Sequence, residues 1–335
     1  MSLASTAHGT ISTFFSNLFI SLPYPNTSFE NQTIIVTGSN TGLGFEASRH
    51  LVRLGVHKLI MAVRNLEKGE KAKREILTST NRPDDSIEVW NLDMDSYESV
   101  KKFAVRISTS LDRLDGVLAN AGIMTTEFRM SEDNERTITV NVVATFLLIL
   151  LLLPKLHESA EKYKINPRIV IVNSALHYVA STKELDPNDN NNNEIFSRLN
   201  NPKTADMSSR YAVSKLLVLY AVRELAERLK ARKPLVVINT PNPSFCKSGL
   251  MGNDVSFGER TAEKLLARST EMGSRALVHA LSSGVESHGE YLTNCHVQQP
   301  SCLVTDAKGV QIQKKFWKEL VQKLEKVAPG IESNI

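Results

Sequence analysis

The sequence predicts one α/β domain: a doubly wound, mostly parallel sheet of seven strands with helices on both faces. Three observations support this prediction. Short β-branched runs alternate with longer amphipathic runs, the short runs are almost continuously apolar, and glycines cluster where the first short run ends. Strands that helices cover on both faces have this continuous apolar character. The chain of 335 residues, 41% of them hydrophobic, is long enough to bury one large core.

The expected strands follow one another along the chain, and most of them are separated by helical stretches. They lie at 33–38, 58–64, 87–93, 115–122, 168–175, 234–242 and 289–294. Right-handed crossovers bring the carboxyl ends of parallel strands to one edge of the sheet, where such sheets bind ligands. The residues that follow each strand are therefore the first candidates for a functional site.

The first 29 residues are expected to form an N-terminal extension, followed by the domain itself at 30–335. The extension contains no Lys or Arg, so it lacks the basic start of a secretory signal and the arginines of a transit peptide. Apolar residues recur in it at helical spacing, at Ile11, Phe14, Phe15, Leu18 and Leu22. A short amphipathic helix is therefore predicted at 11–22. Its uncharged polar face favours packing on the domain, and peripheral contact with a membrane is the alternative.

Three later segments complete the predicted organisation. The apolar run at 146–154 is too short to span a bilayer, and Pro154 is expected to end it, so we predict a buried helix. The long connection at 175–206 contains an Asn-rich stretch and is expected to be a binding loop, a lid or an insertion. A C-terminal helix is predicted at about 311–327, with an apolar face for packing.

Composition excludes several classes of function. Forty Lys and Arg against 36 Asp and Glu give a net charge of only +4, with no dense basic run, so nucleic-acid binding has no support. The three cysteines form no CxxC pair, which suits reduced thiols in the cytoplasm. His, Cys, Asp and Glu show no zinc-site spacing, so no metal is expected. We therefore expect a cytoplasmic protein that binds small molecules.

The turn TGSNTGLG at 37–44 joins the first strand to the first helix. Glycine permits a tight turn and a close approach of the backbone to a pyrophosphate, and the helix that follows offers free N–H groups to phosphate oxygens. The spacing is GxxxGxG and differs from GxGxxG, but its placement between strand and helix predicts a dinucleotide site of the Rossmann type. The candidate contacts are Gly38, Ser39, Asn40, Thr41, Gly42, Leu43 and Gly44.

Arg64 ends the second strand, twenty residues beyond Gly44. A NAD-binding unit has an Asp or Glu there for the ribose 2′-hydroxyl, whereas a guanidinium suits a 2′-phosphate. The surrounding MAVRN contains no carboxylate. The sequence therefore favours NADP(H), and a plain surface arginine is the alternative.

Tyr211 and Lys215 stand at i and i+4, on one face of a predicted helix. A phenol titrates near 10 in isolation, and a cation one turn away favours the phenolate and eases proton exchange with a substrate oxygen. The strand that ends in VNSA brings Ser174 to the same edge of the sheet.

Taken in order, the motifs resemble those of the short-chain dehydrogenase/reductase family from about residue 30 to 330. They are TGSNTGLG, NLDM at 91–94, ANAG at 119–122, VNSA at 172–175, YAVSK at 211–215 and TPNPSFCKS at 240–248. The branch looks like the retinol-dehydrogenase and WW-domain-oxidoreductase-like group. The segment LPYPNTSFENQTIIVTGSN at 22–40, which leads into the first strand and its turn, resembles fungal members, and the group often serves lipid or natural-product chemistry.

This resemblance implies roles for particular residues. Tyr211 would be the acid/base, Lys215 its pKa-lowering partner and a ribose ligand, Ser174 the hydroxyl that holds the substrate oxygen, and Asn141 an anchor for a water or backbone link toward Lys215. Further cofactor contacts would come from Asp93 at the adenine, from the fourth strand and from the sixth-strand loop near the nicotinamide. In this sequence they are Asp93, Asn120, Ala121, Gly122, Pro243 and Ser248.

Three positions depart from the family pattern. Ala144 stands where many members have Gly, Ser244 stands where Gly usually follows Pro, and Asn173 replaces a second Ser before Ser174. No proposed catalytic group is lost, so activity is expected. His177 is expected to line the loop and Cys246 to be a small buried side chain.

The expected function is that of an NADPH-dependent reductase, or of an alcohol dehydrogenase in reverse, acting on a ketone or aldehyde of an apolar substrate. Apolar residues near the sixth-strand loop suggest that substrate class, at Phe245, Leu250, Met251 and Phe257. A redox-neutral cyclase or isomerase and a non-catalytic NADP-binding regulator are the alternatives. The sequence fixes neither the substrate, nor the direction of reaction, nor the oligomeric state.

Overall fold

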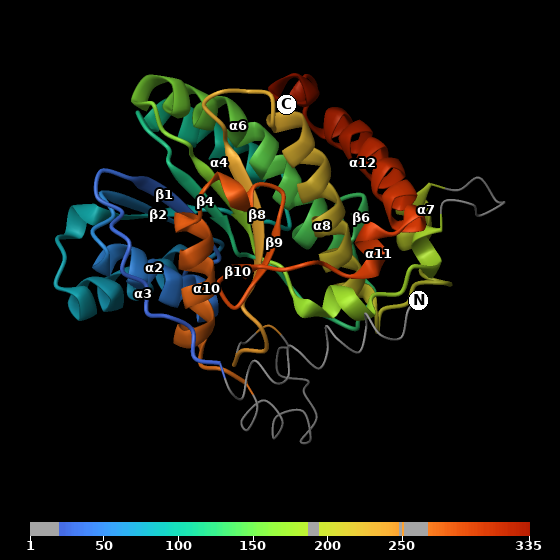
Figure 1. Cartoon of the computed structure of the whole chain (residues 1–335), viewed down its shortest axis with the longest axis horizontal. Coiled ribbons are helices and arrows are strands. Elements are labelled where there is room, and N and C mark those ends of the chain that lie inside the picture. Colours follow the sequence, from blue (N-terminus) through green and yellow to red (C-terminus); the bar gives the residue numbers. More distant parts are fainter. Residues whose placement is uncertain (1–19, 187–193, 248–249, 251–266) are drawn as a thin grey trace.

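The computed structural model describes residues 20–186, 194–247, 250 and 267–335. Its centre is an eight-stranded sheet in the order β10-β9-β8-β7-β4-β1-β2-β3, with helices on both faces (Figure 1). The strands are β1 Thr33–Thr37, β2 Lys58–Val63, β3 Ile87–Asn91, β4 Gly116–Ala119, β7 Arg168–Ile171, β8 Val237–Asn242, β9 Tyr291–Thr293 and β10 His296–Val297. Neighbours from β3 to β9 run parallel. The predicted fold class is confirmed, with all seven expected strands.

The eighth strand, β10, pairs antiparallel with β9 and was not predicted. Asn294 and Cys295 between them have φ values of 50° and 63°, as in the two-residue turns that return a chain beside the strand it has left. Cysteine seldom adopts this backbone, so the turn carries little sequence signal. A separate hairpin, β5 Met130–Ser131 with β6 Asn134–Glu135, precedes the helix that carries Asn141.

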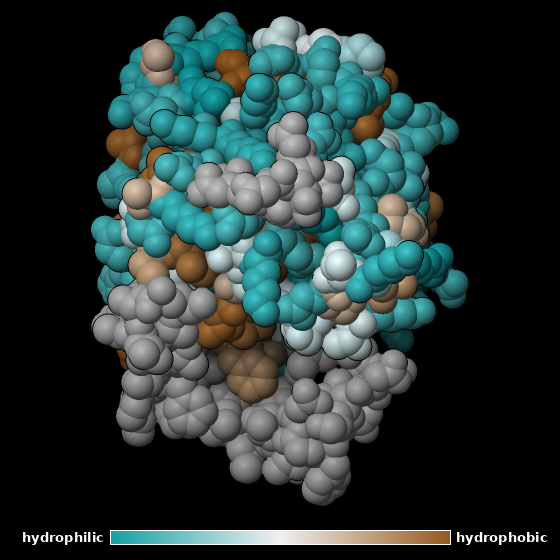
Figure 2. Space-filling view, turned by 90° about the vertical axis from the view of Figure 1, so that its right-hand side faces the viewer, coloured by the Kyte–Doolittle hydropathy of each residue, from teal (hydrophilic) through white to brown (hydrophobic). Residues whose placement is uncertain are grey.

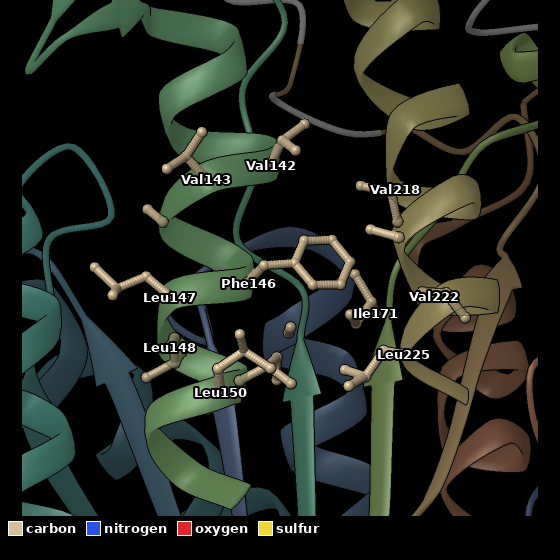
Figure 3. Close-up of a cluster of buried hydrophobic side chains, with 14 of the residues drawn as sticks. Val142, Val143, Phe146, Leu147, Leu148, Leu150, Ile171, Val218, Val222 and Leu225 are labelled. Atoms are coloured by element: carbon tan, nitrogen blue, oxygen red, sulfur yellow. The ribbon is translucent and has the colours of Figure 1, made fainter. Parts of the chain in front are cut away.

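Two helical layers cover the sheet (Figure 1). One layer consists of α2 Gly42–Arg53, α3 Leu66–Thr80 and α10 Thr270–Ser282, and the other of α4 Tyr97–Ser110, α6 Ala144–Tyr163, α8 Arg210–Leu229 and α12 Ala307–Val327. Successive strand residues alternate between the two cores, because side chains of a strand point to opposite faces: Ile35 joins the core with α6 and α8, and Ile34 joins the core with α2. In Figure 3, Phe146 of α6 lies between α6 and α8, facing Ile171 of β7.

Short helical pieces connect these elements. They are α5 Arg136–Ile138, a π-helical turn at Thr139–Val143, α7 Ile195–Leu199, α11 Cys302–Thr305, and 3₁₀ turns at Asp84–Ser86, Ala175–Val179, Lys183–Leu185, Val285–Ser287 and Ile331–Asn334. The long connection at 175–206 is thus partly helical on both sides of 187–193, which lie outside the described residues. The C-terminal helix is confirmed, and it starts four residues earlier than expected because Asp306 caps its first turn through the N–H of Gly309.

The expectation that Pro154 ends its helix is wrong. Helix α6 continues through Pro154 to Tyr163. Proline has no N–H, so the carbonyl of Leu150 loses its usual helical partner, and the side-chain amide of Asn334 donates a hydrogen bond to that carbonyl instead, at 3.1 Å. The continuous helix from Arg136 to Tyr163 is long and apolar enough to cross a membrane, but 89% of its most apolar window is buried inside the protein. The expected buried helix is present.

The end of the N-terminal extension packs on the domain. Residues 20–22 are not helical, and Leu22 is buried against Met272, Ala276 and Cys295. The remainder of the helix that was predicted at 11–22 lies outside the described residues.

Candidate active site and cofactor cradle

The backbone conformation favours glycine at two positions of the first turn, and close packing requires it at the third. Gly38 and Gly42 have φ values of +64° and +61°, which residues other than glycine seldom adopt. A Cβ on Gly44 would lie 2.5 Å from the amide nitrogen of Asn120 and 2.6 Å from the carbonyl oxygen of Gly38. A Cβ on Gly42 would meet nothing within 4 Å. The turn is therefore packed tightly on its inner side and faces open space at Gly42.

The start of α2 is suited to an anion. Thr41, the residue before the helix, makes no capping hydrogen bond with its side chain in the described structure, and the first turn carries no acidic residue. The helix N–H groups are therefore available to phosphate oxygens, and the helix dipole favours negative charge there. The hydroxyl of Ser39 is buried and has no hydrogen-bond partner among the described residues. These features fit the predicted dinucleotide.

Asn120 and Ala121 brace the turn from the end of β4. The amide of Asn120 donates to the carbonyl oxygens of Thr37 and Gly38 at 2.9 and 3.3 Å. The hydroxyl of Thr37 accepts from the backbone N–H groups of Asn120 and Ala121 at 3.0 and 2.9 Å. The strands that flank the switch point of the sheet are thereby tied to each other beside the cradle.

Arg64 and Asp93 lie farther along the same edge of the sheet. Arg64 is exposed directly after β2, and within the described ranges its guanidinium has no recorded hydrogen bond or ion pair. Asp93 is half-buried after β3, where its carboxylate accepts from the N–H of Asp95 at 3.0 Å. Both predicted cofactor residues thus follow strands at the edge of the sheet where the glycine turn also lies.

Tyr211, Lys215 and Ser174 come together as the sequence predicts. The ammonium of Lys215 lies 5.5 Å from the ring centroid of Tyr211 and donates to the carbonyl oxygen of Val172 at 2.8 Å. The hydroxyl of Ser174 lies close enough to the phenol of Tyr211 to lower its pKa. The hydroxyl of Ser174 also accepts from the N–H of Leu176 at 3.2 Å.

Burial shifts the pKa values of Lys215 and Tyr211. It lowers the pKa of Lys215 to about 8. Burial also raises the pKa of Tyr211, and the hydroxyl of Ser174 only partly opposes this effect, because desolvation disfavours the phenolate. The lowering of the phenol pKa by Lys215 stays a prediction.

Asn141 lies in the π-helical turn and is almost fully buried. Its carboxamide exchanges two hydrogen bonds with the backbone of Ile123, at 2.8 and 2.9 Å, and donates to the hydroxyl of Ser214 at 3.0 Å. A Cβ on Gly122 would lie 3.2 Å from the Asn141 oxygen and 4.0 Å from the Lys215 ammonium. Asn141 thus ties the loop after β4 to helix α8 beside Lys215, without touching the ammonium directly.

The neighbouring His177 and Cys246 are structural. The ring of His177 is fully buried between the backbone of Ser174 and that of Ser301, at 2.8 and 3.1 Å. Burial lowers the pKa of His177 to about 4, so the ring is neutral. Burial raises the pKa of Cys246 to about 12, so its thiol keeps its proton. Both interpretations from the sequence agree with this, although His177 is deeper than a loop-lining residue.

Two residues of the site were missed by sequence reasoning. Asn173 is buried and donates to the carbonyl oxygen of Lys215 at 3.3 Å and to the hydroxyl of Thr240 at 3.2 Å, which joins β7, α8 and β8. Asn242, at the end of β8, accepts from the N–H groups of Ala175 and Ser244. The sequence signal that could have identified both residues is a polar side chain at the end of an apolar strand. Pro243 is buried beside Asn242, and Ser248 lies outside the described residues.

Apolar side chains are exposed beside the site. Leu176 and Val179 follow Ser174, and Phe245 follows Ser244, with exposed fractions of 41%, 46% and 37%. Figure 2 shows hydrophobic side chains on the lower part of a face that is otherwise mostly hydrophilic. Among the residues that the structure describes, no cluster of three His, Cys, Asp or Glu could hold a metal ion.

Comparisons with known proteins show the family. A profile of the short chain dehydrogenase family matches residues 32–183. The short chain dehydrogenase/reductase dmxR8 of Cryptosporiopsis sp. is 45% identical over 96% of this chain and 98% of its own. The short-chain dehydrogenase anuD of Penicillium roqueforti is 39% identical over 98% of this chain and 87% of its own.

Solved structures share the fold. The oxidoreductase yciK of E. coli has a TM-score of 0.59 at 21% identity, over 82% of this chain and 98% of its own. A putative short chain dehydrogenase of Escherichia coli CFT073, solved with NADPH, has a TM-score of 0.59 at 22% identity, over 81% of this chain and 99% of its own.

Proposed function

Because the chain belongs to the short-chain dehydrogenase/reductase family and is an oxidoreductase of CH–OH and C=O groups, we propose that it is an NADPH-dependent reductase of an apolar ketone or aldehyde. The observation that carries this proposal is the contact of Tyr211 with Ser174 and Lys215 at the edge of the sheet where the glycine cradle opens. Family members use a nicotinamide cofactor, which supplies the hydride when it is bound.

Tyr211 would donate the proton in the reaction. The raised pKa of its phenol means that it holds a proton at neutral pH, as a general acid must. Ser174 lies near enough to Tyr211 to affect its pKa, so its hydroxyl would hold the substrate oxygen next to the phenol. Placing these two donors on one oxygen stabilises the negative charge that develops there during reduction.

Lys215 would help to restore the proton. With a pKa of about 8, the Lys215 ammonium exchanges protons near neutral pH. Its bond to the carbonyl of Val172 uses one of three N–H groups. The other two could bind a ribose hydroxyl and stabilise the Tyr211 phenolate once the proton has been donated. Asn141 would keep the Ile123 backbone and helix α8 in register beside that ammonium.

NADP(H) is the cofactor that we propose. Arg64 is exposed at the end of β2 and supplies the positive charge that a 2′-phosphate needs. The NADPH in the structure from Escherichia coli CFT073 supports the same choice. The residues that would hold the cofactor are Gly38, Ser39, Asn40, Thr41, Gly42, Leu43, Gly44, Arg64, Asp93, Asn120, Ala121, Gly122, Tyr211, Lys215, Pro243 and Ser248.

The substrate would be a small apolar carbonyl compound, such as a natural product or a lipid. The exposed Leu176, Val179 and Phe245 beside Ser174 and Ser244 would contact its apolar parts. The two relatives named above come from fungi, in agreement with the resemblance to fungal natural-product enzymes. Placement in the cytoplasm stays a prediction, as does membrane contact through 11–22.

The test is Tyr211→Phe, measured by single-turnover oxidation of NADPH with a ketone that a screening panel shows to be reduced. Turnover should fall by roughly 10²- to 10⁴-fold, the usual loss when a general acid is removed, while NADPH binding is unchanged. Tyr220→Phe is the matched control, because Tyr220 is buried in the same helix and donates to Leu303, away from the site. If Tyr211→Phe turns over at the wild-type rate, as Tyr220→Phe should, the proposal is refuted, and a redox-neutral or non-catalytic function takes its place.

A further inference from the structure

Ser244 has an unusual backbone for a serine. It follows Pro243 after β8 and has a φ of +69°, in the left-handed region that favours glycine. Such a conformation costs energy and persists only where the surrounding structure fixes it, and residues of this kind cluster at functional sites. Glycine would adopt the same conformation without that cost.

Contacts on both sides fix this conformation. The side-chain oxygen of Asn242 accepts from the N–H of Ser244 at 2.9 Å, and the Asn242 amide donates to the hydroxyl of Thr293 at 3.1 Å. Beyond Ser244, the backbones of Phe245 and Lys247 exchange hydrogen bonds with Arg268, both at 2.9 Å. The loop is therefore held between β9 and the segment that leads into α10.

The same contacts place Ser244 beside the proposed catalytic group. The Asn242 oxygen that accepts from Ser244 also accepts from the N–H of Ala175, at 3.3 Å. Ala175 directly follows Ser174, whose hydroxyl lies near the phenol of Tyr211. One oxygen atom thus joins the backbone of Ser244 to the backbone next to Ser174.

The hydroxyl of Ser244 is buried and has no hydrogen-bond partner within the described part of the chain. A buried hydroxyl without a partner is unfavourable. Ser244 therefore carries two costs, a left-handed backbone and an unsatisfied hydroxyl, and glycine would remove both. A ligand that bonds the hydroxyl would offset them.

We propose that the Ser244 hydroxyl binds a ligand oxygen of the carbonyl or carboxamide kind next to the reacting group. This inference rests on the proposed reductase function. The oxygen belongs either to the carboxamide of the nicotinamide or to a second oxygen function of the substrate. Ser244 is then a positioning and specificity residue. It follows β8, Ser174 follows β7 and the glycine cradle follows β1 beyond β4, so Ser244 and the cradle lie on opposite sides of Ser174.

The experiment compares wild type with Ser244→Ala and Ser244→Gly. Both variants remove the hydroxyl, but only alanine keeps the strained backbone, so the glycine variant should have the higher Tm of the two. The dissociation constants of NADPH and of 2′-phospho-ADP-ribose, which lacks the nicotinamide, are measured by calorimetry. The KM is measured for a ketone that the wild type reduces.

If the nicotinamide is the source, both variants bind NADPH roughly 3- to 10-fold more weakly, the effect of one hydrogen bond, and bind 2′-phospho-ADP-ribose as the wild type does. If the substrate is the source, KM rises by the same factor and NADPH binding is unchanged. Unchanged values in all three measurements overturn the inference. A wild type that binds no NADPH, or reduces no ketone, instead refutes the proposed function and this inference with it.

Discussion

Arg210, the residue before Tyr211, provides a stability prediction that can be worked out from the structure. Its guanidinium is fully buried and bonds the carboxylate of Glu184 at 2.8 Å. The carboxylate of Glu135 lies 3.6 Å from the Arg210 Nε and is also fully buried. Glu135 starts α5, which leads to Asn141, and Glu184 lies in the connection after Ser174. One buried cation therefore joins the three segments that carry the proposed catalytic residues.

Replacing Arg210 by Met should cost about 3–5 kcal/mol of unfolding free energy, the usual effect of leaving a buried charge without its partner. Glu135 keeps hydrogen bonds from Thr137 and Ile138. Glu184 loses its cation, and its second carboxylate oxygen already has no hydrogen-bond partner among the described residues. Most of the loss should therefore come from Glu184. Such a loss is a large part of the about 5–15 kcal/mol that stabilises a typical protein.

The pH dependence has a definite sign. Burial raises the pKa of Glu184, and Arg210 opposes this effect. The carboxyl of Glu184 therefore keeps its proton to higher pH in the folded state than in the unfolded state. As pH rises above 4.5, the ordinary pKa of this carboxyl, the free energy of unfolding decreases. In Arg210→Met no cation opposes the rise in the pKa of Glu184. The variant's free energy of unfolding should therefore fall further below that of the wild type as pH rises from about 4.5 towards neutral.

Urea unfolding, followed by the fluorescence of the buried Trp90 and Trp317, measures the effect. Adding Glu184→Leu to Arg210→Met should recover part of the loss, because the second change removes the unpaired carboxylate. A loss below about 1 kcal/mol, the value of an exposed ion pair, would refute the reasoning. So would a double variant that is no more stable than the single one.

Two further predictions concern the cofactor. Arg64→Asp should weaken NADPH binding by about 1.5–3 kcal/mol, the value of a hydrogen bond to a charged group, and a calorimetric titration showing a wild type that prefers NADH would contradict the role of Arg64. Gly44→Ala should cost about 1–3 kcal/mol of stability and weaken NADPH binding, because its Cβ would press on Asn120 and on the Gly38 carbonyl. Gly42→Ala is its control in thermal melts: it makes no such contact, so its cost should stay near the 1–2 kcal/mol of a left-handed residue.

The sequence by itself determined the fold class and the order of the strands along the chain, and it predicted the candidate site residues. These features depend on local patterns: apolar runs of strand length, glycines between a strand and a helix, and a Tyr and Lys one helical turn apart. Ser174 at the end of a strand, and Tyr211 at the start of the helix that follows the long connection, indicated that the two would lie near each other at one edge of the sheet. The structure bears out that proximity.

Only the tertiary structure decided the features that depend on distant partners. Pro154 continues its helix because Asn334, 184 residues away, bonds the Leu150 carbonyl. Tyr211 keeps its proton because packing removes water from the phenol, an effect that the spacing of Tyr211 and Lys215 cannot show. Ser244 keeps a left-handed backbone beside Asn242, which accepts from its N–H and is itself held by the hydroxyl of Thr293, 51 residues along the chain. In each case long-range contacts and desolvation determined the result, and neither is written in a local sequence pattern.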